Sequence, residues 1–394
     1  MRHDEDEQPG KDEGRGEDDA VDEGTEAVSW TLALEREWVE QRALAGSMSA
    51  MLLVLQRVLH SADGLPDSAQ VFGLCLRLAE DDHPAACRVV GRAYLAGRGV
   101  DADEATGWQW VKKAADHADP EAMLLWGRAR AFGETPDGET HPGTYIYRAA
   151  LNMQPDALAL MGNIALLAQD RPEEHRADAY AWLSMGASMD DPSALYGLWA
   201  LTAGADDLPT AEHWRTHWLR RAAERGHTPA QRHLGLALWR AATTEAERTE
   251  AATWVQRAAS GKDRDAAFLL SIILRSLGGA SDVALGWLVT AARAGHQGAQ
   301  RDVGRAYAEG ADGVCRPTEA AVWLSRAVVP SERRDTATGN EALELLERVH
   351  AGLSDAQRAE VLGWLAGEDD GEARAVFAGV DDLAAQMRDA RGEA

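Results

Sequence analysis

The feature that most restricts the fold of this chain is an internal repeat with a period close to 36 residues. Alanine recurs at the same place in eight successive copies, at intervals of 33 to 37 residues: Ala50, Ala86, Ala122, Ala157, Ala194, Ala230, Ala266 and Ala299. A period of this length is typical of stacked supersecondary units, because one such unit cannot bury its apolar side alone. The sequence therefore predicts one long repeat array over most of its 394 residues.

Each copy has the pattern of two helices. A large side chain recurs in the second half of the copies, and a small one follows it five residues later; the large ones are Leu74, Trp110, Tyr145, Trp182, Trp218, Trp254, Trp287 and Trp323. Glycines such as Gly97 and Gly99 can end a first helix in the left-handed conformation. Asp101 or Asp103 can then cap the second helix. No alternating strand pattern occurs, so we expect an all-α fold.

A glycine column runs through the first halves of the copies, at Gly91, Gly127, Gly162, Gly235 and Gly304. A residue without a Cβ permits close approach of two helices, so this column predicts where the two helices of a copy touch. Trp199 and Ser271 replace glycine in two copies. We expect Trp199 to hold neighbouring helices apart or to point into a groove.

One copy carries the motif Gly91-Arg-Ala-Tyr94-Leu-Ala-Gly97-Arg-Gly99-Val-Asp-Ala-Asp103, followed by Trp110 and Ala114-Ala115. This motif resembles a Sel-one-like repeat (SLR), the 36-residue relative of tetratricopeptide repeats, and the copy that contains Gly304 is similar. The resemblance spans 46–329 and implies a tetratricopeptide-like, right-handed α/α superhelical solenoid of about eight repeats. It also implies a non-catalytic scaffold or adaptor that binds a protein or peptide partner in the concave groove.

The two ends of the chain depart from the repeat. Residues 1–27 hold 12 acidic and 3 basic side chains and almost no large apolar ones, so we expect a disordered acidic tail. Trp30, Leu34 and Trp38 fall on one helical face, which predicts an N-terminal capping helix over 28–45. Residues 330–394 are expected to form a C-terminal helical cap and tail, with a loop over 330–340, helices over 341–350 and 381–389, and a capping box that opens a helix at Ser354.

Composition excludes several partner classes. With 65 acidic and 40 basic residues, the formal net charge is −25, which argues against nucleic acid and against an anionic membrane surface. Three cysteines are too few for a disulfide framework and suit a reducing compartment. No apolar segment resembles a secretory signal or a membrane span, so we expect a cytoplasmic protein. Arginine outnumbers lysine by 36 to 4, a bias of GC-rich genomes, and we expect a bacterial source.

The resemblance to tetratricopeptide repeats also indicates which positions line the groove. Two first-helix columns and one position beyond them supply the expected partner-binding residues: Arg88, Arg92, Arg128, Tyr196, Arg232, Trp239, Phe268, Arg301 and Arg305. Arginines at both ends of an apolar middle would suit an extended peptide with acidic groups and apolar anchors. The alternative is that the arginines are solvated helix faces and that the apolar members belong to the core.

The sequence contains no complete catalytic constellation, and we expect no cofactor and no metal. His213 and His217 lie four residues apart on an expected helix and could share a metal ion, but a half-exposed helix face around Trp218 is the preferred explanation. Two other functions stay open. One is a metal-dependent or hydrolytic enzyme of the repeat family, and the other is an envelope or polysaccharide-assembly factor, a role of some bacterial members of the family.

Overall fold

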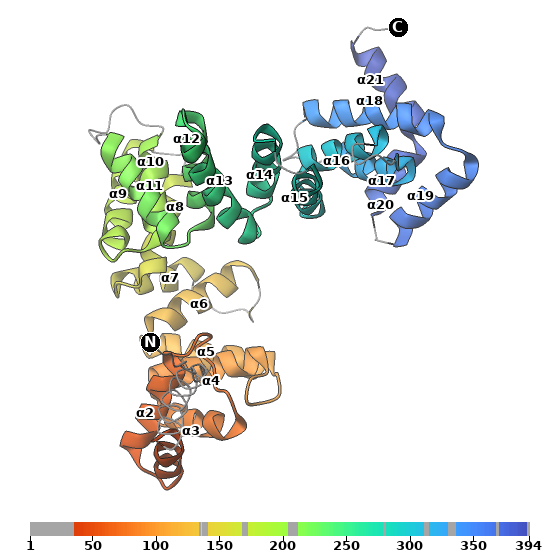
Figure 1. Cartoon of the computed structure of the whole chain (residues 1–394). Coiled ribbons are helices and arrows are strands. Elements are labelled where there is room, and N and C mark those ends of the chain that lie inside the picture. The colour runs from red at the N-terminus through yellow and green to blue at the C-terminus, as the bar shows by residue number, and fades with distance from the viewer. Residues whose placement is uncertain are drawn as a thin grey trace, which may run out of the picture. The chain divides into compact units, whose positions relative to one another are not determined.

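The computed structural model describes residues 35–133, 135, 141–167, 172–203, 212–278, 281–310, 315–329, 336–367 and 370–391 (Figure 1). All regular secondary structure within these ranges is helical, which confirms the all-α prediction. The expected acidic tail at 1–27 lies outside the described residues. The chain divides into two compact units, Met1–Gln169 and Asp170–Ala394.

The helices follow the predicted two-per-copy order. After a helical stretch at 35–44, the first unit contains α2 (Met48–Leu59), α3 (Ala69–Glu80), α4 (Pro84–Ala96), α5 (Glu104–Asp116), α6 (Pro120–Ala131), α7 (Pro142–Leu151) and α8 (Pro155–Leu167). The repeats of the second unit contain α9 (Pro172–Ser188), α10 (Pro192–Ala203), α11 (Glu212–Glu224), α12 (Thr228–Ala241), α13 (Glu245–Ser260), α14 (Arg264–Ser276), α15 (Ser281–Arg293), α16 (Gln297–Glu309) and α17 (Pro317–Val328). Within the repeats of each unit, consecutive helices pack against one another, as a stack of helical pairs requires.

Each first helix begins two residues before its alanine, so the residue three before the alanine stands at the N-cap. The side chain at that position accepts a hydrogen bond from the alanine N–H, over 2.6 to 3.4 Å, at Ser47, His83, Asp119, Gln154, Asp191, His227, Asp263 and His296. We call these residues the cap column. Such a bond satisfies a backbone donor that the first turn of a helix leaves without a partner. The alanines themselves are at most 6% exposed.

The glycine column holds the two helices of a repeat together, as predicted. A Cβ at Gly91 would stand 2.8 Å from the backbone nitrogen of Val111, and one at Gly235 would stand 2.5 Å from a methyl group of Val255. Real Cβ atoms do not approach so closely, so only glycine fits at this distance. Gly97 adopts the left-handed conformation, with φ 66°, and ends α4 as predicted.

The aromatic column is less buried than its pattern suggests. Trp254 is 8% exposed and Tyr145 is 5% exposed, but Trp110, Trp287 and Trp323 are only half-buried. A cation three residues later covers the ring in several repeats; the pairs are Trp110–Lys113, Tyr145–Arg148, Trp254–Arg257 and Trp323–Arg326, with the charge 4.6 to 6.0 Å from the ring centroid. Among the half-buried rings, Trp110 and Trp323 are therefore shielded by cation–π contacts as well as by depth.

Four helices close the second unit: α18 (Thr336–Gly352), α19 (Asp355–Gly367), α20 (Gly371–Ala378) and α21 (Val380–Arg391). The capping box is present, because Ser354 N donates to Gln357 Oε1 at 3.0 Å and Gln357 N donates to Ser354 Oγ at 3.4 Å. Two details differ from expectation. The segment expected as a loop over 330–340 is helical from Thr336, and α20 was not predicted. Leu346, Leu365 and Phe377 share one core with α17, so this cap covers the last repeat.

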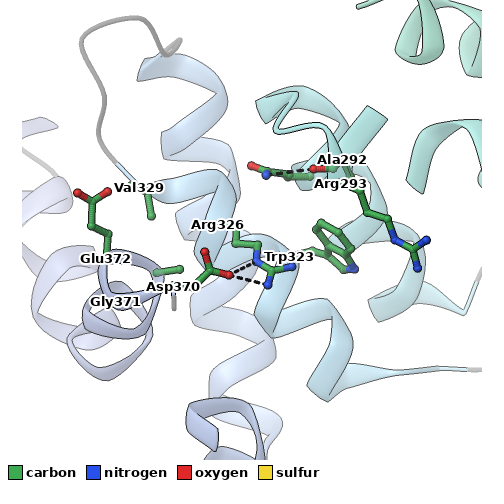
Figure 2. A pocket seen from close by; sticks show the side chains of 10 residues that line it. Ala292, Arg293, Trp323, Arg326, Val329, Asp370, Gly371 and Glu372 are labelled. Carbon is green, nitrogen blue, oxygen red and sulfur yellow. Dashed lines mark hydrogen bonds and ion pairs between the residues drawn. The ribbon is translucent and has the colours of Figure 1, made fainter. Parts of the chain in front are cut away.

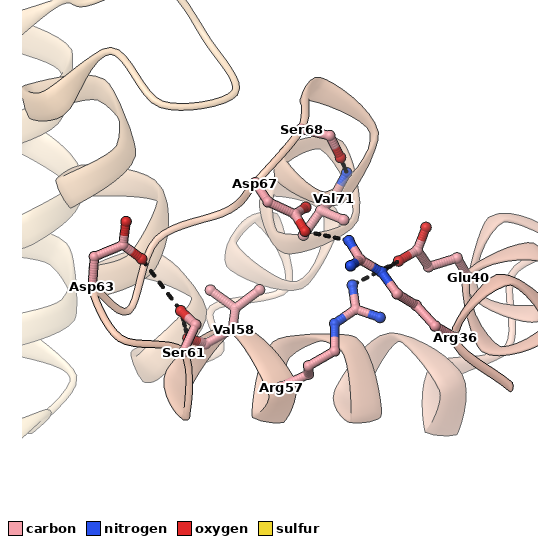
Figure 3. Close-up of polar contacts among 9 residues, drawn as sticks. All are labelled: Arg36, Glu40, Arg57, Val58, Ser61, Asp63, Asp67, Ser68 and Val71. Carbon is pink, nitrogen blue, oxygen red and sulfur yellow. Dashed lines mark hydrogen bonds and ion pairs between the residues drawn. The ribbon is translucent and has the colours of Figure 1, made fainter. Parts of the chain in front are cut away.

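Charged side chains fasten the N-terminal helical stretch to the first repeat (Figure 3). Arg36 contacts Asp67, just before α3, and its Nε donates to Glu40 Oε1 at 3.1 Å. Arg57, in α2, donates to the same Glu40 oxygen at 2.7 Å. Glu40 thus links two arginines from different helices, and its side chain is only 17% exposed.

Candidate functional site

The expected groove residues lie on the first helices of their repeats. Several of the arginines among them form ion pairs with acidic residues from outside the two groove columns. Arg88, on α4, donates from Nε to Asp119 Oδ1 at 2.9 Å and lies 2.8 Å from Glu121 Oε2. Its side chain is 9% exposed. Asp119 is the cap of α6, so this arginine joins one repeat to the start of the next.

Arg232 repeats the same geometry in the second unit. Its Nε donates to Oδ2 of Asp263 at 3.0 Å, and Asp263 caps α14. The side chains of Arg232 and Asp263 are 23% and 12% exposed. Positive charge at this position is therefore largely neutralised inside the repeat stack.

Aromatic groove residues contact histidine caps in the same way. Tyr196 lies over His227, the cap of α12, with ring centroids 4.6 Å apart, and Phe268 stacks on His296, the cap of α16, at 4.2 Å. Together with the two arginine contacts above, this gives four contacts to helix caps: Arg88 and Arg232 each bind an aspartate cap, and Tyr196 and Phe268 each stack on a histidine cap. The first groove column thus connects consecutive repeats through matched pairs.

Tyr196 and Trp199 belong to a larger ring cluster between α10 and α12. Their centroids lie 5.2 Å apart, and Trp199 lies 4.8 Å from His233. Burial raises the pKa of Tyr196 and lowers the pKa of His227 and of His233, so all three rings favour the neutral form. Trp199 therefore fills the space between first helices with a neutral aromatic surface, and it is half-buried there.

A second apolar region continues along the same face. Trp239, on α12, packs partly buried against the core shared by α13 to α16, as does Phe268. Leu236 is half-buried, and Ile272 is 40% exposed. We call Tyr196, Trp199, Leu236, Trp239, Phe268 and Ile272 the apolar row; all six lie on first helices of the second unit.

The remaining predicted residues differ in accessibility. Arg301 lies 2.8 Å from both Asp302 and Glu341, and its side chain is 18% exposed. Arg305 lies 3.8 Å from Glu341 and stays 42% exposed. In the first unit, Arg92 donates to the Asp63 carbonyl at 2.9 Å, and Arg128 is exposed without an ion pair among the described residues.

The histidine pair considered for a metal does not form a metal centre in the described chain. His213 and His217 are exposed and flank Trp214, with centroids 4.8 and 5.7 Å from that ring. The described residues hold no group of three or more histidine, cysteine, aspartate or glutamate side chains that could bind a metal ion. Cys75 and Cys87 are buried and free, and burial raises the pKa of Cys75 to about 12.

A cavity of about 670 Å³ opens where the last repeat meets the C-terminal cap (Figure 2). Its wall comprises Ala292, Arg293, Gln300, Trp323, Arg326, Val329, Asp370, Gly371, Glu372 and Ala373. Arg326 binds Asp370 at 2.6 Å in the middle of this wall, and its guanidinium lies 4.9 Å from the Trp323 ring centroid.

No helix within the described ranges has the length and apolar content to cross a membrane.

Comparison with known families finds Sel1 repeats in both units. The Sel1 repeat model matches residues 84–119, 216–227, 228–263 and 298–328. These segments include the best-conforming copies recognised in the sequence, those around Gly91 and Gly304.

Solved structures with the same architecture include a protective antigen of uropathogenic Escherichia coli with an SLR fold. The two sequences are 22% identical. The superposition covers 88% of this chain and 74% of the antigen, with a TM-score of 0.62. A Sel1 repeat protein from Oxalobacter formigenes shares 21% identity, covers 61% of this chain over 96% of its own length, and gives a TM-score of 0.50. At these identities the likeness establishes the solenoid fold and nothing about a ligand.

Proposed function

We propose that this chain, which contains Sel1 repeats and has the fold of SLR proteins, is a non-catalytic scaffold that binds a protein or peptide partner through the apolar row. Helical-repeat solenoids are commonly used for protein–protein interaction, because stacked first helices present an extended surface. The observation that carries the proposal is the ring cluster around Trp199. It places tryptophan and tyrosine, which are common binding anchors, on a partly open face.

The charges around the apolar row indicate what the partner offers. Arg232 is neutralised by Asp263, so the centre of the row favours apolar anchors over charged ones. Arg305 and Arg275 are accessible beyond Ile272 and can receive acidic groups. The partner is therefore an extended segment with one or two large apolar side chains followed by carboxylates.

A matched pair of charge insertions tests this proposal. Ile272, on first helix α14, is 40% exposed, and Val283, on second helix α15 of the same repeat, is 50% exposed. Proteins captured from the native host by the unmodified chain are identified, and their affinities are then measured with purified components. Ile272→Glu should weaken partner binding by at least about tenfold, the loss of one good apolar anchor. Val283→Glu should leave it unchanged, and equal effects of the two substitutions would exclude the apolar row as the binding surface.

A further inference from the structure

The cavity between the last repeat and the C-terminal cap lies outside the apolar row and contains polar groups that neither packing nor the proposed function uses (Figure 2). It is formed by the end of α15, by α16 and α17, and by the first turn of α20. A volume of about 670 Å³ is within the range of pockets that hold small organic ligands. The cavity therefore has the size of a binding site.

The central part of the wall is electrically balanced. Arg326 and Asp370 lie 2.6 Å apart, and both contacts from the guanidinium go to one carboxylate oxygen, Oδ2. The guanidinium also lies against the Trp323 ring. These two residues neutralise each other, so they favour neither an anionic nor a cationic ligand.

Two opposite charges flank this neutral centre. Figure 2 shows Glu372 on the Val329 side and Arg293 beyond the Trp323 ring, with the Arg326–Asp370 pair between them. Both side chains are exposed, and neither has an ion-pair partner among the described residues. One side of the cavity thus attracts an ammonium group, and the other attracts a carboxylate.

Gln300 adds an unused acceptor at the wall. It is 5% exposed, and its Nε2 donates to the Ala292 carbonyl at 3.2 Å, which fixes the orientation of the amide. Its Oε1 is buried and has no hydrogen-bond partner in the described part of the chain. Gln231 makes the same contact two repeats earlier, to Ala223 at 3.1 Å, but is half-buried. A buried acceptor without a donor is costly, so a ligand N–H at this wall would be stabilising.

We propose that this cavity binds a short free peptide as a zwitterion. Its terminal ammonium group lies towards Glu372, its terminal carboxylate lies towards Arg293, and a backbone N–H donates to Gln300. The uncharged centre accommodates the peptide backbone, and Val329 and Ala292 contact small apolar side chains. The two chain termini of a peptide match the two unpaired charges of the cavity in sign and order.

The experiment measures binding of trialanine, N-acetyl-trialanine and trialanine amide to the full chain by isothermal titration calorimetry. Exposed ion pairs are weak, so removing either terminal charge should weaken binding by roughly two- to fivefold. Glu372→Gln should abolish the difference between trialanine and its N-acetyl form only. Arg293→Gln should abolish the difference between trialanine and its amide only. Arg240→Gln, an exposed arginine on α12, is the charge control and should change neither difference.

A second arm tests the buried amide. Gln300→Leu should weaken trialanine binding by about tenfold or more, since one hydrogen bond at a buried acceptor is lost, whereas Gln231→Leu should not. Glycine, which has no amide N–H to donate to Gln300, should bind more weakly than trialanine. No trialanine binding at 10 mM, taken as roughly the limit of the assay, or equal affinities for trialanine and its two capped forms, would overturn the proposal. A cavity that holds only water would give this result.

Discussion

Arg232 donates to Asp263 over 3.0 Å, and the same aspartate caps the first helix of the next repeat through its other oxygen. Phe268 and His296 take the equivalent places one repeat later and stack at 4.2 Å. One pair is an ion pair and the other is a stack of two rings, but both have the same structural role. Each links a first helix to the cap that opens the following first helix.

This equivalence predicts that the pairs are exchangeable only as pairs. Arg232→Phe leaves Asp263 without its cation, and Asp263→His places an imidazole against a guanidinium, so each single substitution should cost about 1–2 kcal/mol. The double substitution recreates the Phe268–His296 contact and should recover about 1 kcal/mol relative to the sum of the singles. Urea unfolding of the four proteins measures this coupling. Additive losses would show that the two residues contribute independently.

Much of the fold is readable from the sequence because its determinants are local and periodic. The alanine and glycine columns predict the helical pairs and their contact surface, and Gly91 and Gly235 have the close neighbours that this role requires. The 36-residue spacing also leads to the Sel1 repeats directly. These features can be predicted without knowing which residues of neighbouring repeats are in contact.

The candidate site was harder to predict because it depends on contacts between repeats. Arg88 belongs to an acid-free column, and only stacking brings Asp119, 31 residues later, within 2.9 Å of it. The cap column itself was visible as the position three residues before each alanine. It was missed because His227 and Gln154 are uncommon helix caps. Helix α20 has eight residues and lies outside the period, so no repeat pattern indicates it.

The buried member of the aromatic column should matter most for stability. Trp254 is 8% exposed and packs with Leu219 and Leu234, so Trp254→Ala should cost about 3–5 kcal/mol. Trp214 is 48% exposed, and Trp214→Ala should change the free energy of unfolding by less than about 0.5 kcal/mol. Thermal unfolding and limited proteolysis compare the two. Equal protease sensitivity of both variants would contradict the core position of Trp254.

The residue before each cap adopts a left-handed conformation, which gives a prediction about backbone strain. Gly226 has φ 88°, whereas Ala118 occupies the equivalent place with φ 66°. A Cβ disfavours this backbone conformation by about 1–2 kcal/mol, and replacing Ala118 by glycine removes that strain. Glycine also loses more chain entropy on folding, which offsets part of the gain, so Ala118→Gly should stabilise the protein by about 0.5–1 kcal/mol. Gly226→Ala, which meets no atom within 4 Å, should destabilise it by a similar amount. A calorimetric melting temperature that moves in the same direction for both variants would refute the strain argument.

The histidine caps should make stability depend on pH. His227 accepts the Ala230 N–H through Nδ1 at 3.2 Å, and burial lowers its pKa below the ordinary value of 6.5. A proton on Nδ1 removes this acceptor and places a charge on a ring that burial keeps from water. The unfolded chain therefore takes up the proton at a higher pH than the folded chain does. The stabilisation is fully present above about pH 6.5 and is lost as the pH falls through the lowered pKa of His227.

Replacement of His227 by asparagine, a common helix cap with no titrating proton in this range, tests the effect. The unfolding free energy is measured at pH 7.5 and pH 5, which lie about one unit or more on each side of an ordinary histidine pKa. It should fall less between these two pH values in His227→Asn than in the unmodified chain. The fall should not vanish, because burial also lowers the pKa of His233 and His296. His213, which is exposed and caps no helix, provides the control, and His213→Asn should keep the original pH profile. If the profiles of His227→Asn and the unmodified chain coincide, the neutral cap does not contribute to stability.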